Sequence, residues 1–140
     1  MNAVVLAQQT QLDLLDAAVA AAAEFNGCLV RLFKNNLALS PLTLLADLSV
    51  ADFHGYADSA AVTWGTAFLD PAQQPTINGD LKSFVATTPF SNPNIIYGWA
   101  LIDSGATKLL AARLLDAPVN ITAIGQAVKV LPAIPAFLPE

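Results

Sequence analysis

The stretch that decides the fold is Asn94-Ile95-Ile96-Tyr97-Gly98-Trp99-Ala100-Leu101-Ile102. Most of its residues are β-branched or aromatic, which favours a strand. Turn-forming residues 103–106 follow, and residues 107–115 then predict a partner strand. Residues 107–115 could instead be helical, because leucine, alanine and lysine favour helix. A hairpin is the preferred interpretation, since two apolar runs flank one tight turn.

Shorter strand signals lie on both sides of this hairpin. Turn residues separate each run from the next, as expected for antiparallel strands. Asn78-Gly79 predicts a hairpin turn between two of them. The expected strands are residues 28–34, 61–69, 75–77, 81–87 and 126–131, with a short helical turn at residues 49–53. The sequence therefore predicts a mainly β domain, either a β-sandwich or a curved antiparallel sheet of about seven short strands.

One helix is expected near the N-terminus, over residues 10–25. Its apolar residues form two neighbouring stripes with helical spacing, so we expect the helix to pack on two sides. Thr10 can cap its first turn, and Asn26-Gly27 supplies a residue type that ends helices. The helix belongs to a single domain that spans residues 1–130.

Residues 131–140 differ in character from the rest of the chain. Three prolines within nine apolar residues predict an extended, proline-rich C-terminal arm. The large apolar side chains of this arm would be costly to leave in water, so they should fill a groove. That groove could lie on the same subunit or on a neighbour. The candidate assembly contacts are Pro132, Ile134, Pro135, Phe137 and Leu138.

Composition limits the classes of partner. Hydrophobic residues make up 55% of the chain and charged residues 12%, more apolar than a disordered chain or a lone soluble monomer needs. Part of this surplus is expected to be buried in a homo-oligomer. The net charge is −5 and the few bases are scattered, which argues against nucleic-acid and membrane partners. No apolar run is long enough for a membrane-spanning helix.

Residues that could carry chemistry are few. His54 is the only histidine, and Asp52 or Asp58 could orient it as a general base, but no nucleophile motif accompanies it. Cys28 is the only cysteine and is interpreted as a small buried hydrophobe. These residues give no expected metal site, no cofactor and no enzyme activity.

Aromatic residues offer a second kind of candidate site. Trp64, Tyr97 and Trp99 could form a platform on which a sugar or a base stacks. Tyr97 and Trp99 are expected to share one strand face with apolar neighbours and so to belong to the core. Tyr56, beside Gly55, and Trp64 are therefore the candidates for exposed aromatic residues.

Two short segments are distinctive: the acidic-Phe-His-Gly-Tyr run at residues 52–56 and the Tyr-Gly-Trp strand at residues 97–99. Together with residues 12–17, 29–36, 44–51, 63–65 and 111–119, they resemble a group of small structural proteins of tailed-phage particles.

This resemblance implies a component of the virion, made in the host cytoplasm. The expected function is a capsid decoration (cement) protein that binds the major capsid protein or another virion protein. A homo-oligomer, for example a trimer, would suit that role. The alternative is a tail or fibre module that binds a host-surface glycan.

Overall fold

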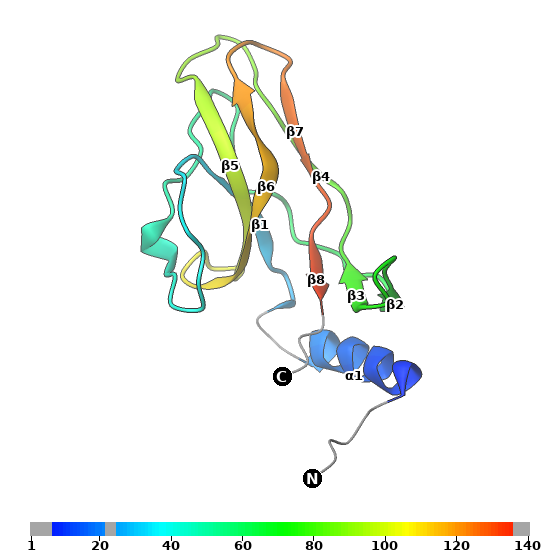
Figure 1. Ribbon diagram of the computed structural model, residues 1–140. Coiled ribbons are helices and arrows are strands. Elements are labelled where there is room, and N and C mark those ends of the chain that lie inside the picture. The colour runs from blue at the N-terminus through cyan, green and yellow to red at the C-terminus, as the bar shows by residue number, and fades with distance from the viewer. Residues whose placement is uncertain (1–6, 22–24, 136–140) are drawn as a thin grey trace.

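The protein is mainly β, as predicted (Figure 1). The computed structural model describes residues 7–21 and 25–135. Over these residues the chain forms one α-helix, one 3-10 turn and eight strands arranged in three antiparallel sheets. The elements are α1 (Gln8–Ala21), β1 (Leu29–Phe33), the 3-10 turn Leu45–Asp47, β2 (Phe68–Leu69), β3 (Pro75–Asn78), β4 (Lys82–Val85), β5 (Asn94–Ile102), β6 (Leu109–Ile121), β7 (Ala127–Val130) and β8 (Ala133–Pro135).

The predicted hairpin at the centre of the chain is confirmed. β5 lies between β1 and β6 in a three-stranded sheet, with Leu29 opposite Ile102 and Trp99 opposite Arg113. The β5–β6 turn is fixed by the Asp103 carboxylate, which accepts hydrogen bonds from the backbone N–H groups of Thr107 and Lys108 at 2.7 and 2.9 Å. The helical alternative for residues 107–115 is thereby excluded.

An irregularity in this hairpin decides which side chains enter the core. Ile96 lies opposite Val119, but Gly98 lies opposite Leu114, so the register shifts at Tyr97. Trp99 therefore faces the main core together with Ile96, whereas Tyr97 packs on the other face of the sheet. The expectation that Tyr97 and Trp99 share a face is wrong, because a β-bulge reverses the alternation between them.

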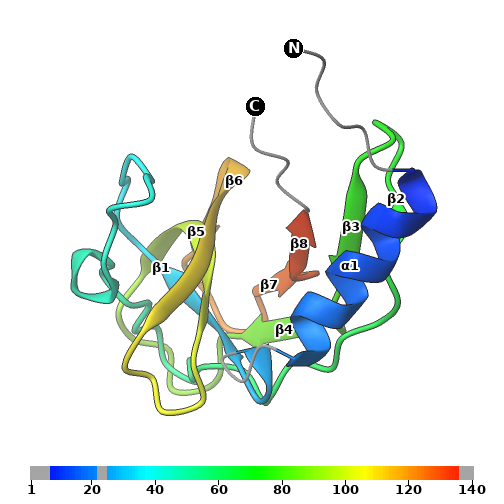
Figure 2. The same ribbon diagram turned by 90° about the horizontal axis from the view of Figure 1, so that it is seen from below.

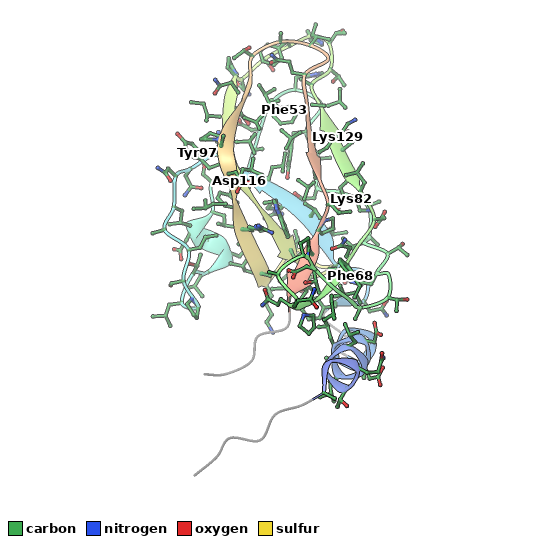
Figure 3. The ribbon with its side chains drawn as sticks, turned by 45° about the vertical axis from the view of Figure 1, so that its right-hand side comes forward. Phe53, Phe68, Lys82, Tyr97, Asp116 and Lys129 are labelled. Atoms are coloured by element: carbon green, nitrogen blue, oxygen red, sulfur yellow. The ribbon has the colours of Figure 1, made fainter. Side chains whose placement is uncertain are left out.

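The main core lies between two sheets. β4 and β7 pair with each other and contribute Phe84, Val128 and Val130. These residues meet the inner face of the β1–β5–β6 sheet, and Phe53, labelled in Figure 3, is buried with them. The opposite face of the β1–β5–β6 sheet is covered by the loop over residues 35–48.

The predicted hairpin at Asn78-Gly79 does not form. β3 pairs with β2 and β8, whereas β4 pairs with β7, so the chain changes sheets at Gly79. The backbone N–H of Gly79 donates to the carbonyl of Pro132 at 2.8 Å. A Cβ at Gly79 would lie 2.3 Å from Val62 Cγ1, so this glycine permits a close approach rather than a tight turn.

Three local predictions need correction. The helix begins at Gln8, before the expected cap Thr10. Residues 49–53 are not helical, because Ala51 donates its N–H to Leu32 and Val50 bridges Phe33. The expected strand over residues 61–69 is reduced to β2 and to a bridge between Trp64 and Gly79.

Among the helix side chains that the structure describes, packing is seen on one side, which differs from the expected two. Leu12 and Leu15 contact a small cluster that includes Ala67 and Ile77, because α1 lies along the β2–β3 side of the molecule (Figure 2). On the second predicted stripe, Leu14 remains 54% exposed. Within the described part of the chain, no helix is long and apolar enough to span a membrane.

Candidate assembly groove between β6 and β8

Two strand edges face each other across an open groove. β6 is the last strand of the β1–β5–β6 sheet, and β8 is the last strand of the β2–β3–β8 sheet. Seen from below, β8 lies between β6 and β3 (Figure 2). The groove has a volume of about 400 Å³ and is lined by Asp70, Gln74, Thr76, Trp99, Ala111, Ala112, Arg113, Ala133 and Ile134.

The groove joins an apolar surface to one cation, Arg113, and one acid, Asp70. Trp99 and Ile134 both pack on the main core. Arg113 is exposed at the rim, and among the described residues no carboxylate lies within ion-pair distance of it. A second hollow of about 200 Å³ continues along β6 toward β7 and shares Trp99 and Arg113 with the first. The free edge of β6 thus opens onto two neighbouring hollows.

The sequence of β6 suits an edge strand that another strand could extend. β6 includes Pro118, which lacks an N–H donor and is tolerated at sheet edges. Its only charged residues are Arg113 and Asp116. Exposed edges usually carry more charge or are kept short, because a long apolar edge attracts further strands. β6 has thirteen residues, so this edge has little protection against strand addition.

The described part of the proline-rich arm packs against its own subunit, one of the two alternatives left open by the sequence. Pro132 is almost fully buried, and Ile134 lies opposite Ile77 in the β3–β8 pair. Pro135 ends β8 opposite Thr76. Phe137 and Leu138, the other two candidate contacts, lie outside the described residues.

The groove residues were not predicted as a site. The sequence predicts Trp99 as a core residue, with a stacking platform as the alternative, and it places Arg113 among the scattered bases. Strand order creates the groove, because β6 and β8 come together only when both sheets are assembled. The long run of residues 109–121 with only two charges was the one signal available in the sequence.

The prediction that Tyr56 is exposed is wrong. Its ring packs between Phe53 and Phe84, with centroid distances of 5.5 and 5.7 Å. Its hydroxyl donates to Asp58 at 2.8 Å and accepts from the backbone N–H of Leu32 at 2.9 Å. Asp58 also pairs with Arg31 at 2.7 Å. Tyr56 therefore links the loop that carries Asp58 to β1 through these two hydrogen bonds, and its ring is not available as a stacking surface.

This environment gives a testable pH dependence. Burial, with the hydrogen bond to Asp58, raises the pKa of Tyr56 well above its usual range. In the folded state the Tyr56 hydroxyl therefore keeps its proton at a pH of about 10, at which the hydroxyl of the unfolded chain loses it. The corresponding stability is present below that pH and is lost as the pH rises further. We expect the free energy of unfolding, measured in urea, to fall steeply above about pH 10.

The Tyr56→Phe variant supplies the control for this pH dependence. It should be less stable near neutral pH by about 1–2 kcal/mol, because the N–H of Leu32 loses its acceptor. Its stability should then decline less as the pH rises above the tyrosine range. Parallel alkaline profiles for the two proteins would contradict the assignment to Tyr56.

Trp64 is half-buried at the edge of another hollow. Its ring meets Phe25 edge-on at 6.2 Å, and its Nε1–H donates to the Phe25 carbonyl at 3.2 Å. The hollow has a volume of about 630 Å³, and Asp16, Asn26 and Thr63 contribute polar groups to its lining. Trp64 thus keeps one of the features expected of a sugar-stacking residue, while the stacking platform with Tyr97 and Trp99 is not assembled.

The residues considered for catalysis are not brought together as a dyad. His54 Nδ1 lies 3.1 Å from Thr87 Oγ1. Asp52 instead accepts hydrogen bonds from Asn94 and Lys34, which lower the pKa of its carboxyl. Asp58 is occupied by Arg31 and Tyr56. Among residues 7–21 and 25–135, no group of three or more histidine, cysteine or acidic side chains could hold a metal ion.

No family model, curated protein or solved structure matches the chain. No relative therefore informs the role of the groove or of Trp64.

Proposed function

We propose that the chain is a structural subunit of a tailed-phage virion, and that it acts as a capsid decoration protein assembled as a homo-oligomer. The observation that supports this role best is the pair of open strand edges around the groove between β6 and β8. Such edges recruit further strands, so a subunit that carries them is suited to a permanent assembly. The sequence resemblance supplies the phage context.

The apolar surface supports the same role. Leu42 and Leu44 are 85% and 65% exposed in the loop that covers the outer face of the β1–β5–β6 sheet. Leu81, directly before β4, and Val85, at its end, are also exposed. Stable assemblies bury roughly 1,200–2,000 Å² per interface, and exposed apolar side chains of this kind supply such area. The major capsid protein is the proposed partner for these surfaces.

The proposal is tested by binding to purified phage heads. Heads from the encoding phage with this gene deleted should bind the purified chain to saturation, at a fixed number of copies per head. Complete heads serve as the control, because their sites are already filled. Cosedimentation followed by quantitative gel analysis measures both values. Absence of saturable binding to the deleted heads would reject a decoration role.

One observation favours the alternative, a tail or fibre module that binds a host-surface glycan. Trp64 and the polar groups of Asp16, Asn26 and Thr63 line one hollow, and an aromatic ring beside polar groups is suited to a sugar. A glycan array would separate the two roles. Binding that is lost in Trp64→Ala, together with no binding to heads, would favour the glycan module over decoration.

A further inference from the structure

We propose that the groove between β6 and β8 receives residues 136–140 of a second copy of the chain, which adds a short strand between the two open edges. This inference deepens the self-assembly part of the proposed function and rests on it. Its test uses the purified chain without heads, so its failure is distinguishable from failure of head binding.

Position and length make these residues a suitable donor. β8 ends at Pro135, and its residues Ala133 and Ile134 already line the groove. The five residues Ala136-Phe137-Leu138-Pro139-Glu140 follow directly. In extended form they would span about 16 Å, at about 3.3 Å per residue. That length matches a short added strand running beside residues 111–113 of β6, which line the opposite wall.

The chemistry of the segment complements that of the groove. Phe137 and Leu138 are large and apolar, as are the groove residues Trp99 and Ile134. Glu140 carries a negative charge, and Arg113 at the rim has no ion-pair partner among the described residues. Backbone N–H and C=O groups at the free edges of β6 and β8 would supply the hydrogen bonds of strand addition.

A second copy suits the groove better than the segment of the same chain. To enter its own groove, the chain would have to reverse direction immediately after Pro135. Tight hairpin turns require residues that accept positive φ, typically asparagine, aspartate or glycine. Residues 136–139 are Ala-Phe-Leu-Pro, so they lack these residue types. A turn here would also include Phe137 and Leu138, which would then not be free to bind the groove. An extended segment from a neighbour needs no turn.

Disulfide trapping between two differently tagged chains tests this proposal. One chain carries Ala111→Cys, on the β6 wall of the groove and on the same sheet face as Trp99, and the other carries Leu138→Cys. The native Cys28 is fully buried, so it should not react. On mild oxidation of the mixture, we expect a reducible dimer that contains both tags. The matched control replaces Ala111→Cys with Ser83→Cys, at an exposed position on β4, and should give little of this dimer.

Placing Ala111→Cys and Leu138→Cys in one chain distinguishes the source of the segment. A covalent dimer or larger species supports exchange between copies. An internal disulfide, which migrates as a monomer on a non-reducing gel, would overturn the proposal in favour of the same chain. No disulfide in either design would overturn it as well.

A charge exchange gives an independent measurement. Arg113→Glu should shift the oligomer toward monomer in light scattering, because it places two acids together. Adding Glu140→Arg in the same chain should restore the oligomer, since the pair is then reversed in every contact. Far-ultraviolet circular dichroism checks that both variants fold. An oligomer unchanged by Arg113→Glu, or a double variant that remains monomeric, would contradict the proposed contact.

Discussion

Replacing Gly98 with alanine is expected to lower the free energy of unfolding by about 3 kcal/mol, the upper part of the usual range for overpacking. Gly98 sits at the bulge of β5, where the backbone of β6 and the ring of Phe33 approach closely. A Cβ at this position would lie 2.4 Å from the carbonyl oxygen of Arg113 and 2.3 Å from Phe33 Cζ. Because one of these atoms belongs to the backbone, rotating a side chain cannot relieve the clash.

Urea denaturation of wild type and Gly98→Ala measures this loss. Gly105→Ala is the matched control, because its Cβ would meet no atom closer than 3.8 Å. Gly105 also lies in the β5–β6 hairpin, at the turn, so both variants probe one element. Equal midpoints for the two variants would show that β5 and β6 can move apart at low cost.

Removing the Asp58 carboxylate is expected to have the second large effect. Arg31 donates to both carboxylate oxygens of Asp58, at 2.7 to 3.2 Å, and the Tyr56 hydroxyl donates to one of them. The side chains of Arg31 and Asp58 are only 15% and 21% exposed. Asp58→Ala leaves the guanidinium without its acceptor in a mostly buried position. We expect a loss of about 2–3 kcal/mol, somewhat below the value for a fully buried pair.

Lys34→Ala is the comparison for this prediction, because Lys34 and Asp52 form an exposed ion pair. Exposed pairs contribute about 0–1 kcal/mol, so this variant should unfold close to wild type. Thermal and urea unfolding of both variants would measure the difference. Similar losses for Asp58→Ala and Lys34→Ala would indicate that burial adds little to the Arg31–Asp58 pair.

The parts of the fold that depend on local sequence could be predicted. β5 and its turn to β6 follow from residues 94–106 alone, because a β-rich run meets a strong turn signal. β1 likewise matches its apolar run. The change of sheets at Gly79 could not be predicted, since Asn-Gly is also a hairpin signal and only distant strands decide the outcome. The same holds for the bulge at Tyr97, which reversed the expected face of one aromatic residue.

The candidate site was less predictable than the fold. Pro132 and Ile134 were recognised as unlikely to remain in water, yet their groove partners came from β6. Trp99 and Arg113 become neighbours of β8 only through strand order, which periodicity does not encode. Tyr56 is wrongly predicted to be exposed, because the only local signal is the glycine before it. That signal does not reveal the hydrogen bonds of its hydroxyl to Asp58 and to the backbone of Leu32.

The pairing of β3 and β4 with late strands has a consequence for synthesis. Lys82 of β4 pairs with Val130 of β7, and Asn78 of β3 pairs with Ala133 of β8, so both partners are synthesised much later. Neither pairing can form on the ribosome until residues 127–135 have emerged. Contacts so distant along the chain raise the contact order and slow folding. The nascent chain should therefore expose β4 and the β8-binding edge of β3 from their synthesis until the end of translation. A chaperone that shields these residues would raise the yield of folded protein.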